Sequence, residues 1–152
     1  MLTVGSPAPD FALPSDTGEA VRLSALKGRQ VVVYFYPRDD TPGCTRQACG
    51  IRDAWEAFAA TGAAVLGISR DGQDSHAKFR AKYELPFTLL SDPDHAVAEA
   101  YGAWGEKTMY GKKVMGIVRS TVVIGADGKV KAVFPRVKPD AHARQVLDAL
   151  EA

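Results

Sequence analysis

The sequence predicts an α/β fold in which a central mixed β-sheet is flanked by helices. Two apolar runs, residues 31–36 and 63–69, lack polar alternation, which is the habit of strands buried on both faces. Segments with helical spacing of apolar residues follow both runs, and alternating β and α units give neighbouring parallel strands. Further along, Ala126-Asp127-Gly128 is a strong hairpin signal, which adds antiparallel strands to the sheet.

The first thirty residues are expected to form an N-terminal β-hairpin extension of this sheet. Residues 10–13 and 20–23 flank a turn at 16–18, and the second piece alternates weakly between apolar and polar residues. Residues 24–28 then turn into the first buried strand. A short exposed hairpin therefore precedes the α/β units.

The middle of the chain is expected to contain three helices. The first carries an apolar stripe of Ile51, Trp55 and Phe58 and ends at Gly62. The second begins at Asp74 or Ser75 and stops at Pro86, and a strand at 87–90 follows it. The third follows the capping cluster 91–95 and ends at Gly102. A Gly- and Lys-rich loop is expected at 104–116.

The C-terminal part is expected to contain two strands and a helix. The strands, 117–124 and 129–134, flank the hairpin signal, and an amphipathic helix is expected from about Pro139 to Glu151. The sequence contains no repeat, low-complexity tract or linker. Residues 1–152 are therefore expected to form a single domain, which is long enough to bury a core of its own.

Composition and charge argue against several classes of function. The chain is 46% hydrophobic and 24% charged, which is ordinary for a soluble globular protein. Its 19 basic and 18 acidic residues give a net charge of +1, so charge does not favour binding to nucleic acid or to a membrane surface. The N-terminus lacks signal-peptide features, and no apolar stretch reaches membrane-spanning length. A cytoplasmic location is expected.

Both cysteines lie in the segment 37–49, between the first buried strand and the first helix. A thiolate at the start of a helix is stabilised by the positive end of the helix dipole, so this position suggests chemistry. In the reducing cytoplasm, two cysteines five positions apart are more often reactive or inert than permanently bonded to each other.

Helix geometry separates the two cysteines. Because each residue turns an α-helix by about 100°, Cys44 aligns with the apolar stripe to within about 40°, whereas Cys49 points about 140° away. The Cα atoms of residues five apart on a helix are roughly 8.6 Å apart. Disulfides rarely span more than about 7 Å between Cα atoms. A Cys44–Cys49 disulfide would therefore require the helix to unwind.

Less reactive interpretations of these cysteines stay open. A free cysteine is often a small buried hydrophobe, and Cys44 on the apolar stripe fits that description. A structural zinc site is disfavoured because His76, His95 and His142 lie far from the cysteines and show no paired spacing. The Cys-x-x-Cys spacing of thiol–disulfide exchange sites is absent. No metal or cofactor is expected.

The residues around Cys44 favour an activated thiol. Thr41, three positions earlier, can bring its hydroxyl to the thiol or can cap the helix. Gly43 lets a ligand approach the backbone, whose amides would point at an anion or a polarised oxygen. Pro37 shields one wall of the site or simply terminates the strand. Arg119 is unusual at the start of an apolar strand, where it is either a functional cation or a solvent-facing end residue.

The pattern Pro37-x3-Thr41-x2-Cys44, with Cys49 and the distant Arg119, resembles the peroxiredoxins. Further motifs are similar to the PrxQ subfamily, also called bacterioferritin comigratory proteins, and together they extend the likeness over nearly the whole chain: Tyr34-Phe-Tyr-Pro37, Thr41-Pro-Gly-Cys-Thr-x-Gln-Ala-Cys49, Val65-Leu-Gly-Ile-Ser69, Phe87-Thr-Leu-Leu-Ser-Asp92, Trp104-Gly-Glu-Lys107 and Arg119-Ser-Thr121.

The resemblance implies a thioredoxin-like fold and a thiol peroxidase that reduces hydrogen peroxide and organic hydroperoxides. Cys44 matches the peroxidatic cysteine of the family and Cys49 the resolving cysteine. Thr41 matches the residue that hydrogen-bonds the peroxide and the thiolate, Arg119 the arginine that stabilises both, and Pro37 the proline that shields the site. By the same resemblance, thioredoxin is the expected reductant.

The residues and the resemblance together suggest a reaction cycle. Arg119 and the helix N-terminus favour the thiolate of Cys44, which attacks one peroxide oxygen while Thr41 and the turn amides stabilise charge on the other. Cys44 becomes a sulfenic acid and condenses with Cys49 to a disulfide, and an external dithiol protein resets the pair. The unwinding that the disulfide requires should leave the oxidised loop locally disordered.

Two other functions are compatible with the same residues. In a redox-sensing interaction module, oxidation would unwind the loop and change a partner surface. In a binding domain, Cys44 would be buried and inert. An in-chain Cys49 removes the need for a partner's cysteine, so the chain is expected to act as a monomer.

Overall fold

A mixed five-stranded sheet forms the centre of the molecule, as the sequence predicts. The structure is a computed structural model that describes residues 2–152, with the side chain of Met109 outside the description. In spatial order the strands are β5 (Thr88–Ser91), β4 (Ala64–Ser69), β3 (Val31–Phe35), β8 (Ser120–Ile124) and β9 (Val130–Phe134). β3, β4 and β5 are parallel to one another, whereas β8 runs antiparallel to both β3 and β9.

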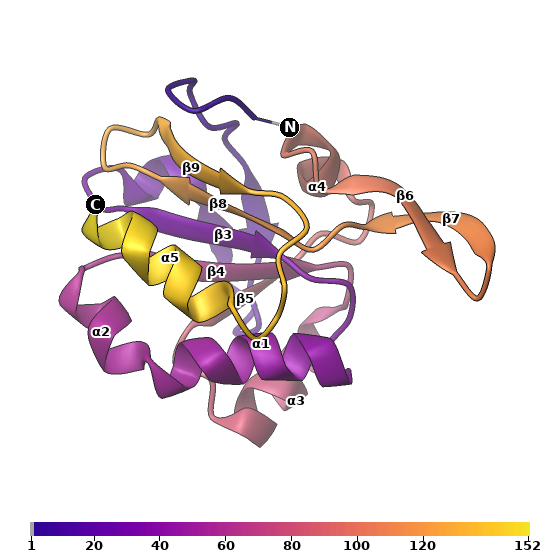
Figure 1. The fold of residues 1–152 in the computed structure, drawn as a ribbon. Coiled ribbons are helices and arrows are strands. Elements are labelled where there is room, and N and C mark those ends of the chain that lie inside the picture. Colours follow the sequence, from indigo (N-terminus) through magenta and orange to yellow (C-terminus); the bar gives the residue numbers. More distant parts are fainter. Residues whose placement is uncertain (1) are drawn as a thin grey trace.

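Helices flank this sheet on both faces (Figure 1). They are α1 (Pro42–Asp53), α2 (Trp55–Ala60), α3 (Gln73–Tyr83), α4 (Ala96–Ala100) and α5 (His142–Glu151), with a 3₁₀ turn at Leu23–Leu26. Buried side chains of α1, α2, α3 and α5 pack on one face, and α4 and the N-terminal segment pack on the other. No helix among residues 2–152 is long and apolar enough to cross a membrane.

Strand β3 divides the two cores because successive side chains of a strand point to opposite faces. Val32 and Tyr34 belong to the core under α1 and α5, and Val33 and Phe35 belong to the core on the opposite face. Every residue of β3 is buried. The absence of polar alternation in the sequence is thus explained by burial on both faces.

The N-terminal hairpin is present and pairs β1 (Ala12–Pro14) with β2 (Ala20–Arg22). The segment around it reaches two edges of the central sheet. Ser15 makes an isolated bridge to Leu90 of β5, and Pro7 bridges to Lys129 next to β9. The N-terminal extension therefore runs from one edge strand to the other.

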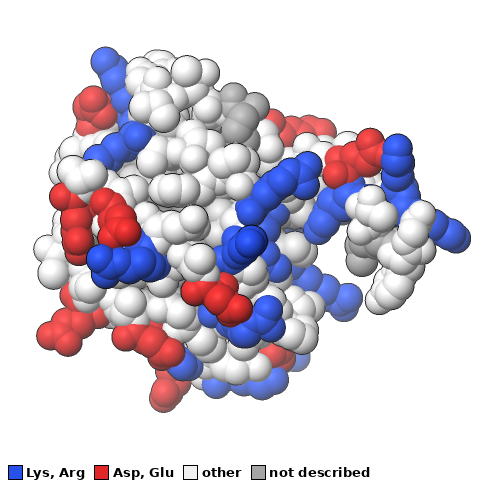
Figure 2. All heavy atoms as spheres, in the orientation of Figure 1, with Lys and Arg blue, Asp and Glu red and all other residues white. Residues whose placement is uncertain are grey.

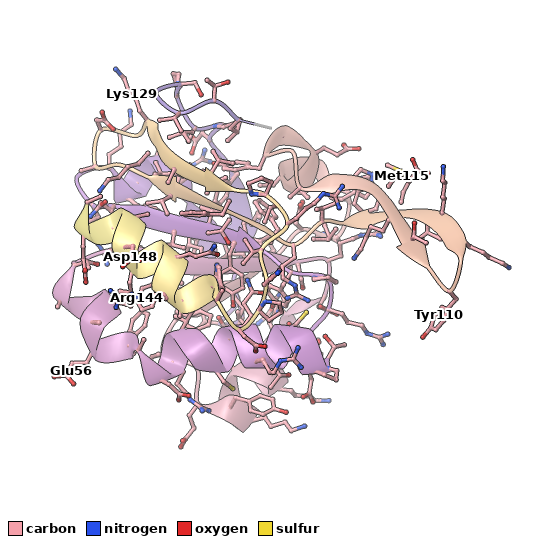
Figure 3. All side chains as sticks on the ribbon, viewed as in Figure 1. Glu56, Tyr110, Met115, Lys129, Arg144 and Asp148 are labelled. Atoms are coloured by element: carbon pink, nitrogen blue, oxygen red, sulfur yellow. The ribbon has the colours of Figure 1, made fainter. Side chains whose placement is uncertain are left out.

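The predicted loop at 104–116 is wrong, because this segment forms a second β-hairpin. β6 (Trp104–Met109) pairs with β7 (Lys112–Ile117) through a turn at Tyr110 and Gly111, whose φ angles are 52° and 77°. Two positive φ values are what a two-residue hairpin turn requires, and the high Gly and Lys content hid this signal. The hairpin projects from the body of the molecule (Figure 1). Tyr110 and Met115 extend from it into solvent (Figure 3).

Several predicted boundaries also differ. The strand predicted at 117–124 is divided, since β7 ends at Ile117 and β8 begins at Ser120. The first helix is interrupted at Ala54, which has φ −99° and ψ 14°, so that α2 is a separate short helix. α3 has Gly72 at its N-cap instead of Asp74 or Ser75, and α5 begins at His142. These differences leave the predicted order of the central sheet and its helices intact.

The surface carries both charge signs. On the face shown in Figure 2, acidic and basic side chains are interspersed over the body of the molecule. This mixture agrees with the net charge of +1.

Candidate active site

Cys44 lies in the first turn of α1, where the chain leaves β3 and turns into the helix. α1 begins at Pro42, a favoured residue at the first helical position because it has no N–H to satisfy. The amides of Gly43 and Cys44 belong to the first turn, whose N–H groups have no partner within the helix. The Cys44 side chain is only 2% exposed and faces the core under the sheet. The apolar alignment predicted for Cys44 is confirmed.

Arg119 is brought next to Cys44 from a distant part of the chain. It lies in the short break between β7 and β8, and its Nη2 donates a hydrogen bond to Cys44 Sγ at 3.4 Å. The contact places a positive charge beside the sulfur atom of Cys44. Arg119 is half-buried and points toward Cys44, so it is not a solvent-facing end residue; its role as a functional cation stays a prediction.

Gln47 is a residue of this site that the sequence analysis missed. It is fully buried, and its Oε1 accepts a hydrogen bond from Arg119 Nη1 at 2.6 Å. Gln47 thus binds Nη1 of the guanidinium, while Nη2 donates to Cys44. Gln47 lies three residues after Cys44 on the same helix face, and a polar residue on that buried face was the available signal.

The position of Arg119 leaves little room for a side chain at Gly43. A Cβ atom at Gly43 would lie 3.1 Å from Arg119 Nη2 and 3.6 Å from Pro139 Cγ. The first distance is tighter than ordinary carbon contacts, so any side chain here would displace the guanidinium. In this structure Arg119 lies close to Gly43, and the predicted approach of a ligand to the Gly43 backbone stays a prediction.

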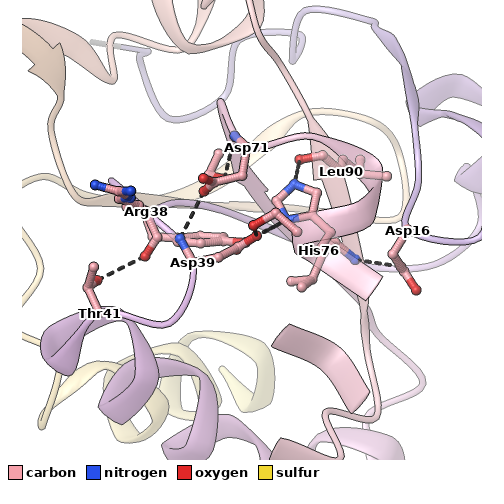
Figure 4. A network of polar contacts seen from close by, with 11 residues as sticks. Asp16, Arg38, Asp39, Thr41, Asp71, His76 and Leu90 are labelled. Carbon is pink, nitrogen blue, oxygen red and sulfur yellow. Dashed lines mark hydrogen bonds and ion pairs between the residues drawn. The ribbon is translucent and has the colours of Figure 1, made fainter. Parts of the chain in front are cut away.

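Thr41 occupies the N-cap position of α1, but its side chain makes no capping hydrogen bond. Its Oγ1 instead donates to the backbone oxygen of Arg38 at 2.9 Å (Figure 4). Among the described residues, no hydrogen bond joins Thr41 to Cys44. Pro37 is half-buried two residues after the end of β3, where it leads into this loop.

Cys49 lies on the same unbroken helix as Cys44, and both cysteines are free. Its side chain is half-buried. Burial raises the pKa of the Cys49 thiol, Arg52 lowers it and Asp53 raises it again, so the thiol keeps its proton at neutral pH. The structure is therefore that of a reduced site.

Two further titratable side chains lie near Arg119: Lys107, which is half-buried, and His142, which is buried. Burial lowers the pKa of Lys107 on β6, the charge of Arg119 lowers it further, and the charge of Cys44 raises it. Between α5 and β8, His142 Nε2 lies 2.7 Å from Thr121 Oγ1, and burial lowers the pKa of His142 to about 3. His142 is therefore neutral and adds no charge at neutral pH. The described residues contain no cluster of three His, Cys, Asp or Glu side chains that could hold a metal ion.

Comparison with known proteins decides the family. Residues 4–133 match the AhpC/TSA family. The chain is 50% identical over 149 residues to a putative peroxiredoxin Bcp of Coxiella burnetii, covering 98% of this chain and 99% of that protein. It is 45% identical over 150 residues to peroxiredoxin Bcp of Bacillus subtilis, covering 99% and 96%. This chain belongs to the AhpC/TSA family of peroxiredoxins.

Solved structures support the same assignment. The fold is similar to that of the bacterioferritin comigratory protein of Xanthomonas campestris, with a TM-score of 0.91, 38% identity and 98% of each chain covered. That structure was studied for the alkyl peroxide reduction activity of the Xanthomonas protein. The predicted thioredoxin-like fold and the resemblance to the PrxQ subfamily are confirmed. As a peroxiredoxin, the chain is a thiol peroxidase that uses a peroxide and a thiol reductant.

Proposed function

We propose that Cys44 is the peroxidatic cysteine of this peroxidase and that Cys49 resolves it through an intrachain disulfide. The observation that carries the proposal is the hydrogen bond of 3.4 Å from Arg119 to Cys44 Sγ at the start of α1. It joins a cation, a helix N-terminus and a buried thiol in one place. This combination favours a thiolate that reacts with peroxide.

In the first step, the Cys44 thiolate attacks the terminal oxygen of the peroxide. An S–O bond forms as the O–O bond breaks, so that sulfur is oxidised to sulfenic acid and the peroxide is reduced. The leaving oxygen takes a proton and departs as water or as an alcohol. Arg119 and the free amides of the first turn stabilise the charge that develops on the peroxide oxygens. Thr41 would join them after its hydroxyl turns away from Arg38.

In the second step, Cys49 attacks the sulfur of the Cys44 sulfenic acid. An S–S bond forms, the S–O bond breaks, and the oxygen leaves as water with the proton of Cys49. An intact helix holds residues five apart at a Cα distance of roughly 8.6 Å, beyond disulfide reach. The first turns of α1 must therefore unwind before this step.

In the third step, an external dithiol returns two electrons and restores both thiols. We assign this role to thioredoxin, acting in the cytoplasm on a monomeric chain whose residues 1–152 form one domain. The assignment is supported by the in-chain Cys49, which needs no cysteine from a second subunit. The substrates assigned are hydrogen peroxide and organic hydroperoxides, supported by the alkyl peroxide activity of the Xanthomonas relative.

The test is thioredoxin-coupled consumption of hydrogen peroxide by the wild type and by Cys44→Ser. We expect the serine variant to lose turnover, because a hydroxyl cannot form the sulfenic acid. Full turnover in this variant would refute the proposal. Mass spectrometry of peroxide-treated wild type should find the Cys44–Cys49 disulfide, and thioredoxin should remove it.

The same measurement separates a redox-sensing module from an enzyme. A sensor would react slowly with peroxide and would keep its disulfide in the presence of thioredoxin. Rapid repeated cycling is expected for the enzyme, and its absence together with a persistent disulfide would favour the sensor.

A further inference from the structure

The loop that precedes Cys44 is tied to α3 by two adjacent aspartates. Asp39 and Asp40 lie between β3 and the N-cap Thr41, and both bond to side chains of α3. The Asp39 side chain is 3% exposed, whereas that of Asp40 is 42% exposed. These contacts play no part in the chemistry proposed above, yet they hold the segment that carries Thr41.

Asp39 is the centre of a buried hydrogen-bond network (Figure 4). Its Oδ1 accepts a hydrogen bond from the hydroxyl of Tyr36 at 2.5 Å. Its Oδ2 accepts one from Ser75 Oγ at 2.8 Å and lies 2.7 Å from His76 Nδ1. Both carboxylate oxygens are therefore bonded to groups that are themselves buried or half-buried.

His76 is fully buried and uses both of its ring nitrogens. Nε2 lies 2.9 Å from the backbone oxygen of Leu90 on β5, which can only accept, so Nε2 carries a hydrogen. Nδ1 lies 2.7 Å from Asp39 Oδ2, within hydrogen-bond distance of the carboxylate. His76 thus links the loop to α3 and to an edge strand of the sheet.

The backbone of the loop that precedes Cys44 is also held, by a hydrogen bond to the side chain of Asp71. The amide of Asp39 donates to Asp71 Oδ2 at 2.8 Å, and Ser69 Oγ donates to the same oxygen at 2.7 Å. The next residue, Asp40, has φ 55°, in the left-handed region that residues other than glycine seldom adopt. The loop conformation is therefore imposed by its contacts more than by local preference.

We propose that Asp39 and His76 are positioning residues of the peroxidase, forming a buried anchor that fixes the loop in front of Cys44. The anchor places Thr41 and the first amides of α1 for the reaction with peroxide, and it stays formed when α1 unwinds. This inference rests on the function proposed above, because it assumes that Cys44 is the reacting thiol.

The opposite end of α1 is tied to α3 as well. Arg52 Nη1 donates to the backbone oxygen of Tyr83, the last residue of α3, at 2.8 Å. α1 is thus held at its start through the anchor and near its end through Arg52. The rearrangement that brings Cys44 to Cys49 is confined to the turns between these two attachments.

The test compares two contacts of the same helix. Asp39→Ala removes the carboxylate that binds His76, and Lys82→Ala removes the exposed cation that pairs with Asp40 at 2.7 Å. Stopped-flow measurement of the first oxidation step should show a rate constant about 10- to 100-fold lower in Asp39→Ala, because small misplacements of reacting groups cost that much. Lys82→Ala should stay within about twofold, as expected for an exposed ion pair. Asp39→Asn, which can still bond to Tyr36 and His76, should restore most of the rate.

Formation of the disulfide gives a second readout. In Asp39→Ala this step should be as fast as in the wild type or faster, because a released loop does not hinder unwinding. If Asp39→Ala only lowered the stability of the fold, the folded fraction of this variant would keep the wild-type rate constants for both oxidation and disulfide formation. An unchanged first step in Asp39→Ala, equal slowing by Lys82→Ala, or no recovery in Asp39→Asn would overturn the anchor.

Amide exchange in the wild type tests the anchor without a substitution. On oxidation, residues 44–51 should lose protection, whereas the Asp39 amide bonded to Asp71 should keep it. Loss of protection at Asp39 equal to that in α1 would overturn the inference. Failure of the proposed function itself is recognised separately, because Cys44→Ser would then still consume peroxide.

Discussion

The two cysteines of α1 lie five residues apart on one helix but differ in burial and in the groups around them. Cys44 is buried in the first turn and receives a hydrogen bond from Arg119 at 3.4 Å. Cys49 is half-buried in the middle of the helix, where burial raises the pKa of its thiol. Position on the helix therefore places one thiol beside a cation and the other where burial favours the protonated form.

In the proposed mechanism, this difference in surroundings explains why Cys44 reacts first and Cys49 second. The first turn offers unpaired amides and places the cation of Arg119 beside Cys44. In the middle of the helix the amides are already bonded within the helix, and the charge of Arg52 only partly offsets the effect of burial on the Cys49 thiol. In the mechanism proposed above, Cys49 attacks only after α1 opens.

Removing Cys49 should sharpen the contrast most strongly. Cys49→Ser is expected to keep the first oxidation step within about twofold, because among the described residues the side-chain hydrogen bonds of Arg119 go to Gln47 and Cys44 and not to Cys49. Turnover with thioredoxin should be lost almost completely, since the sulfenic acid cannot form the intrachain disulfide. Stopped-flow and coupled assays on one preparation measure both. Undiminished turnover would show that another thiol resolves Cys44.

Arg119→Ala should have the next largest effect. Loss of the cation that contacts Cys44 is expected to lower the rate constant of the first step by about 10²- to 10³-fold, as for removal of other charge-stabilising donors. The matched control is Arg46→Ala, which removes an exposed cation of α1 paired with Asp140. That variant should react at nearly the wild-type rate. Equal effects of the two substitutions would mean that general positive charge matters more than the contact.

Two glycines of α1 allow a finer comparison. Gly43→Ala places a Cβ 3.1 Å from Arg119 Nη2, whereas at Gly50 the nearest atom is 3.9 Å away. We expect Gly43→Ala to slow the first step by about tenfold through a displaced guanidinium. Gly50→Ala should leave that step unchanged. A slow first step in both variants would contradict the close approach as the cause.

The smallest expected effect concerns the unwinding itself. Alanine is preferred over glycine in a helix interior by roughly 0.5–1 kcal/mol, so Gly50→Ala should stabilise the closed helix. Because a disulfide requires the open form, the Cys44–Cys49 equilibrium should shift toward the dithiol by about two- to fivefold. Titration against a thiol–disulfide buffer measures this shift. No change would indicate that Gly50 stays helical in the oxidised state.

The pKa of Cys49 gives a pH test of the same comparison. Because burial raises that pKa, its thiolate appears at higher pH in the folded chain than in the unfolded chain. Alkylation of Cys49 should therefore rise with pH over a range above that of an ordinary cysteine. Peptide mapping after brief alkylation at a series of pH values follows the Cys49 peptide. Labelling of Cys49 over the pH range of an ordinary cysteine would contradict a raised pKa.

The sequence was sufficient for the parts of the structure that depend on local pattern. The apolar runs identified β3 and β4, and helical spacing placed Cys44 on the buried side of α1. The β6–β7 hairpin was missed because its glycines and lysines are typical of loops. Its turn at Tyr110 and Gly111 needed a positive φ at a tyrosine, which composition does not signal.

Parts of the site that depend on distant residues could not be predicted in the same way. The contact between Arg119 and Gln47 joins positions 72 apart, and the pair of Asp39 and His76 joins positions 37 apart. Neither pair has a spacing rule, because only the folded sheet brings them together. Thr41 shows a different limit, since its N-cap position was foreseen but the direction of its hydroxyl was set by Arg38.

The N-terminal extension has a consequence for how separate molecules meet. Strands at the edge of a sheet present unpaired N–H and C=O groups that can template intermolecular pairing and aggregation. Ser15 bridges to Leu90 on one edge strand, and the Asp16 amide donates to the Leu89 oxygen beside it. At the opposite edge, the Val130 amide donates to the Ser6 oxygen. One segment thus occupies part of both edges, and the enzyme carries its own protection against strand-to-strand association.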